Sequence, residues 1–266
     1  MKLLVRGGTV VTGGCLVERD VLCEDGRVVA LMDPRGRPSA DEAIEASGQL
    51  VFPGFIDPHI HARDPGFGEK EDFGHATRAA ACGGVTTVFD MPNTIPPLSH
   101  ADMFADRTEQ HARQAQVDFG LWGMSLGQEN LGEITNLISK GVVGIKLFWG
   151  YFLDRRTYQL VYDPLPNQAA DLIRPPDDDT VRDLFRRVAT AGGLLAAHCE
   201  DRDVIEAARA RLVHAPQDYD ELLASRPEEA EARAVRRLSM LAAEQGCRFH
   251  VVHVSSKAGV DEVRAA

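Results

Sequence analysis

The chain has 266 residues, of which 44% are hydrophobic and 26% charged, and it carries a formal net charge of −11. This composition excludes disordered and collagen-like proteins, and no apolar run approaches the roughly 18 residues of a membrane-spanning helix. The acidic surplus disfavours nucleic acids and membrane surfaces as partners. The five cysteines form no Cys-x-x-Cys pair and the first residues lack a signal-peptide pattern, so we expect a cytoplasmic protein.

Residues 1–50 have the pattern of a small β-domain. Stretches rich in strand-forming residues alternate with glycine pairs and other turn signals, and they lie at 3–5, 9–12, 17–23 and 27–32. The last two stretches are joined by Asp25-Gly26, a dipeptide typical of tight hairpin turns. We therefore expect a first domain over residues 1–50 and a second over residues 51–266.

From residue 51 the pattern changes to short apolar strands that alternate with amphipathic helical stretches. This alternation is typical of repeated βα units around a parallel sheet. The expected strands are 51–58, 85–90, 117–124, 142–148, 194–198 and 248–254. The clearest helix is expected at 227–245, with Pro227 in its first turn and Gly246 at its end.

The number of strands bears on the fold class. A (β/α)8 barrel of the TIM type needs eight strands and typically about 250 residues. Residues 51–266 supply about six of the eight units, so we expect an α/β barrel truncated before strands 7 and 8. An open, doubly wound sheet is the alternative.

The strongest local motif is Asp57-Pro58-His59-Ile60-His61, at the end of the first barrel strand. Side chains alternate between the faces of a strand, so His59 and His61 point the same way. Two imidazoles at the carboxyl end of a barrel strand can bind one divalent metal ion. A pair of ordinary hydrogen-bonded histidines is the alternative.

Three further residues occupy the same place on later strands. Lys146 lies in an otherwise apolar strand, where a lysine is costly unless it is paired, neutral or modified. A structural salt bridge is its alternative role. His198 and His253 end the strands expected at 194–198 and 248–254. The carboxyl ends of barrel strands meet at the rim that carries active sites, so these residues are expected to converge there.

The run Pro53-Gly54-Phe55-Ile56-Asp57-Pro58-His59-Ile60-His61, with Lys146, His198 and His253, resembles the amidohydrolase superfamily. Within it, the chain is most similar to the cyclic amidohydrolases, which are dihydroorotases, allantoinases, hydantoinases and dihydropyrimidinases. The resemblance extends over essentially the whole chain, and residues 1–50 match the family's small β-sandwich.

This resemblance implies two divalent metal ions, most often Zn²⁺. His59 and His61 would bind the more buried ion, His198 and His253 would bind the other, and Lys146 would bridge both as a carbamate formed with carbon dioxide. The family's proton-shuttling aspartate belongs to the eighth strand, so we expect residues 1–266 alone to be inactive or nearly so. The same resemblance implies a dimer or tetramer.

Two loop residues bear on the substrate, a small cyclic amide or ureide. Arg63 follows the histidine motif as in dihydroorotases, where the matching arginine pairs with the substrate carboxylate, and Asn93 in Met91-Pro92-Asn93 resembles a second carboxylate contact. An arginine fork fits a planar carboxylate in two-pronged fashion. A loop salt bridge of Arg63 to Asp64 or Glu69 is the alternative.

The main expectation is therefore interconversion of dihydroorotate and N-carbamoyl-aspartate. Lys146 in Gly-Ile-Lys-Leu-Phe resembles hydantoinases and allantoinases as much as dihydroorotases, so allantoinase or hydantoinase/dihydropyrimidinase activity is the alternative. A non-catalytic scaffold that keeps the fold is an alternative of another class.

Residues 151–179 are long for a βα connection, and we hypothesise that they cover the metal site, with an oligomer contact as the alternative. Cys199, next to His198, is expected to face away from the site rather than to act as a nucleophile. The remaining histidines are given no role: His75, His100, His111, His214 and His250.

Overall fold

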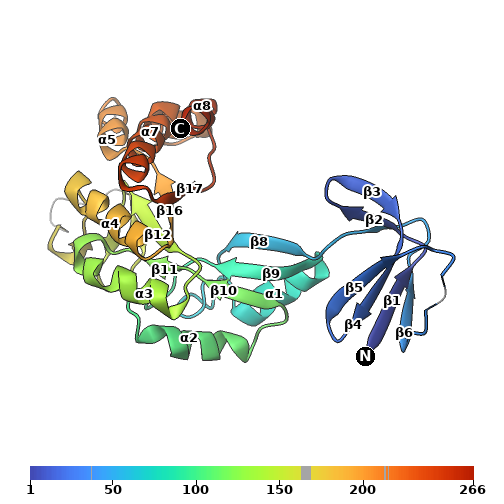
Figure 1. Ribbon diagram of the computed structural model, residues 1–266. Helices are drawn as coiled ribbons and strands as arrows, with labels where there is room; N and C mark the ends of the chain where they lie inside the picture. Colours follow the sequence, from blue (N-terminus) through green and yellow to red (C-terminus); the bar gives the residue numbers. More distant parts are fainter. Residues whose placement is uncertain (37, 163–168, 213, 215) are drawn as a thin grey trace. The chain divides into compact units, whose positions relative to one another are not determined.

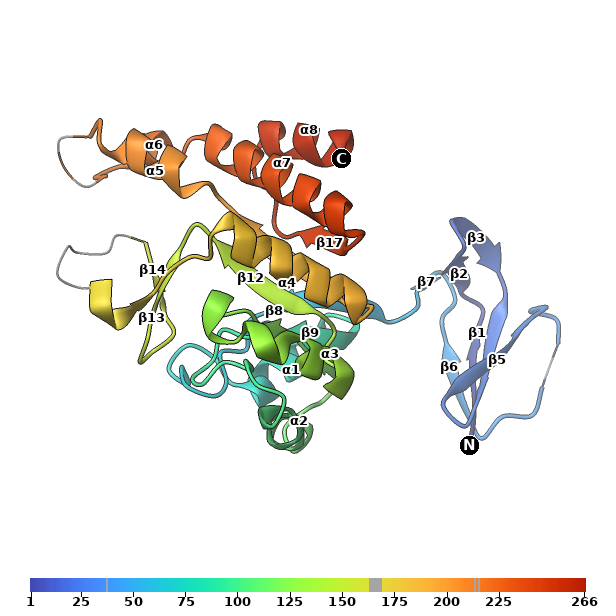
Figure 2. The same ribbon diagram turned by 60° about the vertical axis from the view of Figure 1, so that its left-hand side comes forward.

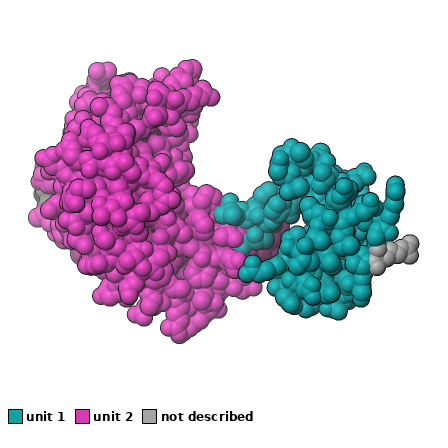
Figure 3. Space-filling view, viewed as in Figure 1, with its two compact units in different colours: residues 1–56, 84–86 teal, residues 57–83, 87–266 magenta. Residues whose placement is uncertain are grey.

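The computed structural model describes residues 1–36, 38–162, 169–212, 214 and 216–266 (Figures 1 and 2). The chain divides into two compact units (Figure 3). One consists of residues 1–56 and 84–86, and the other of residues 57–83 and 87–266. Among the described residues, no helix combines the length and apolar character needed to cross a membrane.

The first unit holds two small sheets of mixed direction. One has the order β5-β4-β1-β6, and its strands are β1 (Lys2–Arg6), β4 (Asp20–Glu24), β5 (Arg27–Met32) and β6 (Glu42–Glu45). The other has the order β3-β2-β7, and its strands are β2 (Thr9–Thr12), β3 (Cys15–Glu18) and β7 (Leu50–Val51). The expected hairpin is present, because β4 and β5 pair antiparallel and Asp25 and Gly26 both have positive φ.

Several strand predictions need correction, among them 248–254, which ends at Val251 so that His253 lies beyond the strand. The stretch expected as one strand at 17–23 is divided at Arg19 between β3 and β4. The strand expected at 51–58 begins later, as β8 (Phe55–Ile60), because β7 pairs with β2 in the first unit. The Pro53-Gly54 break separates β7 from β8, and a Cβ at Gly54 would lie 2.1 Å from the Thr86 hydroxyl.

The main strands of the second unit follow chain order and are divided between a three-stranded and a four-stranded sheet. After β8 they are β9 (Val85–Asp90), β10 (Asp118–Leu121), β11 (Gly123–Met124), β12 (Ile145–Trp149), β16 (Leu194–Cys199) and β17 (Arg248–Val251). The pairs from β9 to β17 are parallel. Only Trp122 separates β10 from β11, and there the strand changes partner from β9 to β12. Within the described residues β17 does not pair with β8, so the barrel is not closed.

The helices of this unit flank its strands, and some of them pack on other helices (Figures 1 and 2). They are α1 (Phe73–Cys82), α2 (Met103–Ala112), α3 (Ile134–Lys140), α4 (Asp178–Thr190), α5 (Arg202–Arg209), α6 (Tyr219–Ser225), α7 (Glu228–Gln245) and α8 (Lys257–Ala265). The main core lies where α3, α4 and α7 pack on β12 and β16. The helix predicted at 227–245 is confirmed as α7, with Pro227 as its N-cap and Gly246 as its left-handed C-cap.

The long connection after β12 has structure of its own. It contains β13 (Phe152–Asp154), β14 (Leu160–Val161) and β15 (Leu172–Ile173), which form an antiparallel sheet in the order β14-β13-β15. A short 3₁₀ turn at Ala169–Asp171 precedes β15. Part of the predicted cover, residues 163–168, lies outside the described residues.

Candidate metal centre

The first histidine pair lies at the end of β8. His59 and His61 point to one side of the strand, and their Nε2 atoms are 3.2 Å apart. Two nitrogens bound at about 2.0–2.1 Å to one tetrahedral ion are separated by about 3.3 Å. Asp57 supports the strand end, because its carboxylate accepts a hydrogen bond from the backbone N–H of His59 at 3.0 Å. The first pair therefore has the spacing of two ligands of one ion.

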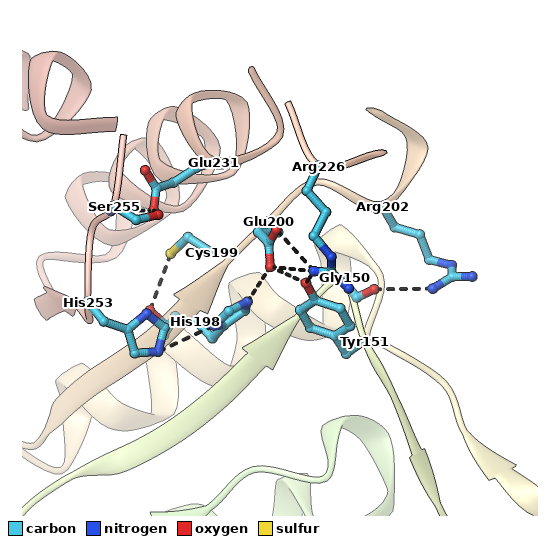
Figure 4. Close-up of polar contacts among 11 residues, drawn as sticks. Gly150, Tyr151, His198, Cys199, Glu200, Arg202, Arg226, Glu231, His253 and Ser255 are labelled. Atoms are coloured by element: carbon cyan, nitrogen blue, oxygen red, sulfur yellow. Dashed lines mark hydrogen bonds and ion pairs between the residues drawn. The ribbon is translucent and has the colours of Figure 1, made fainter. Parts of the chain in front are cut away.

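The second pair comes from neighbouring strands. His198 lies on β16, His253 follows β17, and His198 Nδ1 is 3.3 Å from His253 Nε2 (Figure 4). His253 has a positive φ of 37°, a strained conformation for a residue with a side chain. The rings of His59 and His253 have centroids 5.4 Å apart, so the two pairs adjoin.

Lys146 lies on β12 near both pairs. Its side chain is only 1% exposed, and its Nζ has no hydrogen-bond partner among the described residues. The salt bridge considered as an alternative is therefore absent from the described structure. Burial lowers the pKa of Lys146 to about 7. A substantial neutral fraction follows, and the neutral amine is the form that reacts with carbon dioxide.

Three of the four histidines are also held in the form that binds metals. Burial is the main cause that lowers the pKa of His59 to about 4, His61 to about 3 and His253 to about 4. Nearby cations add to the effect, with Lys146 acting on His59 and Arg63 on His61. Neutral imidazoles at ligand spacing beside an unpartnered buried lysine fit a divalent metal centre, and imidazole donors suit zinc.

The predicted substrate residues lie on the two loops that follow β8 and β9. Arg63 has a positive φ of 61°, and its charge acts on His61, so it lies near that histidine. Asn93 has a buried Oδ1 with no hydrogen-bond partner in the described part of the chain. The backbone N–H of Ile95 donates to Pro65 O at 2.8 Å, which joins the two loops.

Three buried polar residues support these loops and were not predicted. The carboxylate of Asp90 accepts from the backbone N–H of Ala62 at 2.9 Å and lies 3.4 Å from Nε2 of His111. Arg107 donates to the Thr94 hydroxyl at 2.9 Å and to Pro96 O at 2.8 Å. Arg107 and His111 are four residues apart on α2, so they share the helix face that packs inward. That spacing is the sequence signal that could have identified His111.

Cys199 lies in the main core and also lines the cavity that contains His198 and His253. Its side chain is buried, its thiol is 3.4 Å from Ala197 O, and burial raises its pKa to about 12. A thiol in this state is a poor nucleophile.

Carboxylates also gather at the start of α1. Glu71, Asp72 and His75 have ligand atoms within 4.8 Å of one another. Asp72 is the N-cap of the helix and accepts from the backbone N–H of His75 at 2.8 Å, and the His75 side chain is exposed. Helix capping accounts for this group.

A family model, described as the amidohydrolase family, matches residues 50–262. Among curated proteins, the chain is 37% identical over 269 residues to an allantoinase of Rubrobacter xylanophilus. It is 29% identical over 268 residues to an L-hydantoinase of Paenarthrobacter aurescens. Each alignment covers 99% of this chain and 54% of the relative, so the chain spans about half the length of the curated relatives it matches.

Solved structures of similar fold include the L-hydantoinase (dihydropyrimidinase) from Arthrobacter aurescens, with a TM-score of 0.85 and 28% identity. That match covers 99% of this chain and 55% of the other. A crystal structure of D-hydantoinase matches with a TM-score of 0.77 and 26% identity, over 100% of this chain and 55% of that one. These neighbours support the predicted barrel-type α/β fold, and the relatives' names match the alternative activities rather than dihydroorotase.

Proposed function

The chain belongs to the amidohydrolase family, and from this premise we propose that the whole protein hydrolyses the amide C–N bond of a small cyclic ureide. Two imidazole pairs at ligand spacing, around a buried lysine without a partner, carry this proposal. The substrates proposed are of the allantoin or hydantoin class, because the relatives have these names. Dihydroorotate is the second candidate, favoured by Arg63 after the histidine motif.

Each residue has a proposed role. His59 and His61 would hold one ion, His198 and His253 would hold the second, and Lys146, as a carbamate, would supply ligand oxygens to the same centre. When bound, two such ions lower the pKa of water toward neutrality and polarise the amide carbonyl.

Arg63 and Asn93 orient the ring. A guanidinium donates to a ureide carbonyl oxygen as well as to a carboxylate, and the unpartnered Asn93 Oδ1 can accept from a ring N–H. The two joined loops would then bind the ureide through its alternating N–H and C=O groups. Residues 1–266 alone are expected to bind metal but to hydrolyse substrate slowly if at all, since the activity is proposed for the whole protein.

The test is metal content and turnover of the whole protein, with Lys146→Ala and the exposed Lys140→Ala as its matched control. We expect about two metal ions per chain, faster hydrolysis of allantoin or hydantoin than of dihydroorotate, and loss of both properties only in Lys146→Ala. Faster hydrolysis of dihydroorotate than of allantoin or hydantoin would favour dihydroorotate, the second candidate, as the substrate. Metal without turnover of any cyclic amide would favour a scaffold, and an absence of metal would overturn the proposal.

A further inference from the structure

One carboxylate contacts the second histidine pair from outside the ligand set. Glu200 follows β16, its side chain is 17% exposed, and its Oε2 lies 2.7 Å from His198 Nε2 (Figure 4). The same carboxylate accepts from the Tyr151 hydroxyl, and Nη1 of Arg226 lies 3.3 Å from Oε2 and 3.4 Å from Oε1. Glu200 therefore joins His198 to two segments distant in the sequence.

The donors around Glu200 determine where the His198 proton lies. Arg226 can only donate, and it donates to the Tyr151 hydroxyl oxygen as well as to Glu200. The hydroxyl proton of Tyr151 is therefore directed to Glu200. An ionised carboxylate only accepts, so Nε2 of His198 carries a proton, and a ring with a single proton carries it there. The lone pair is then on Nδ1, the atom that faces His253.

Glu200 is itself held in place. Gly150 has a φ of +91°, and a Cβ there would lie 2.1 Å from Glu200 O, so only glycine allows the chain to approach this closely. The guanidinium of Arg226 lies 5.6 Å from the ring centre of Tyr151 and 5.0 Å from that of Tyr162. These contacts fix the carboxylate against His198 from the side opposite His253.

We propose that Glu200 is a positioning residue that holds His198 as the Nε2–H tautomer, with Nδ1 free to bind the second ion. This role rests on the proposed function, because it concerns the same metal centre. Carboxylates that accept from a metal-binding histidine fix its tautomer and ring orientation, and their loss typically costs 10–100-fold in metal affinity. The first pair has no such contact in the described structure, so the effect should be confined to the second ion.

The direct test is the tautomer of His198 in the metal-free whole protein, read from ¹⁵N NMR spectra of labelled histidine rings. We expect the Nε2–H form in the unmodified protein and a mixture of tautomers in Glu200→Gln, because an amide can donate as well as accept. The Nδ1–H form in the unmodified protein would overturn the proposal, whether or not any variant folds.

The second readout is zinc affinity by chelator competition, with Glu200→Gln compared with the exposed Glu229→Gln. We expect the weaker zinc step to lose 10–100-fold in Glu200→Gln only, with the tighter step unchanged. Equal losses in both steps, or none, would reject a role specific to His198. If the unmodified protein bound no zinc, the proposed function would fail, and the tautomer would still decide the role of Glu200.

Discussion

The two histidine pairs are built in different ways. His59 and His61 lie two residues apart on one strand, so the alternation of side chains alone brings them together. His198 and His253 are 55 residues apart and depend on the pairing of β16 with β17 and on supporting carboxylates. A local pair can be recognised from a short motif, whereas a pair built from two strands needs neighbours that no motif marks.

Glu231 is the second supporting carboxylate of the non-local pair. It lies near the start of α7 with 9% of its surface exposed. Its carboxylate accepts from the backbone N–H of Ser255 at 2.9 Å and of Ser256 at 2.8 Å, and from both hydroxyl groups. These bonds fix the segment that leads from His253 into α8.

Glu231→Ala should therefore have the largest effect on the second pair. The change removes the acceptor of four part-buried hydrogen bonds, two from backbone N–H groups and two from hydroxyl groups, which we expect to lower the free energy of unfolding by about 3 kcal/mol. Binding of the more weakly held zinc ion should be lost as well. Urea unfolding and zinc titration check this, with Glu229→Gln as the control expected to stay within about 0.5 kcal/mol of the unmodified protein.

A retained second zinc step in a folded Glu231→Ala protein would mean that strand pairing alone positions His253. The second pair would then need no supporting carboxylate, and the two pairs would not differ in this respect.

Asp90→Ala is the corresponding change beneath the first pair. It removes the acceptor of the Ala62 N–H and the carboxylate beside the fully buried His111, so we expect a loss of about 2 kcal/mol in the free energy of unfolding. The tighter zinc step should remain, because the spacing of His59 and His61 is set within one strand. Substrate KM should rise, since Ala62 adjoins Arg63. Loss of the tighter zinc step at full folding would show that the first pair also depends on distant support.

The sequence predicted the parts of this molecule that depend on local rules. Alternation gave the orientation of His59 and His61, and Pro227 and Gly246 marked the ends of α7 to within one residue. Pairing between distant segments was harder to predict. Leu50–Val51 pairs with β2 in the first unit instead of extending β8. This was hard to predict because β2 lies about 40 residues earlier in the sequence.

The supporting residues were missed for a related reason. Glu200 and Glu231 are ordinary acidic residues in sequence, and only the fold shows that each is surrounded by donors. His111 was given no role, yet it is fully buried beside Asp90. Their roles depend on contacts across 2 to 49 residues of chain, for which a single sequence carries little signal.

Lys146 lies near both pairs and gives the smallest expected change. Met has a similar volume without the charge, so Lys146→Met should raise the free energy of unfolding of the metal-free protein by about 1 kcal/mol at pH 7, while abolishing the bridge.

Burial places the pKa of Lys146 at about 7, below the value of about 10.4 for an exposed lysine. The unfolded chain therefore binds more protons between these values, and the stability of the unmodified protein should rise from pH 7 to pH 10 relative to the variant. Urea unfolding with a chelator in carbon dioxide-free buffer measures both effects. A variant less stable than the unmodified protein at every pH would show that the folded chain stabilises the lysine. The physical reason for its modification would then be lost, and with it the reason for treating the two pairs as one centre.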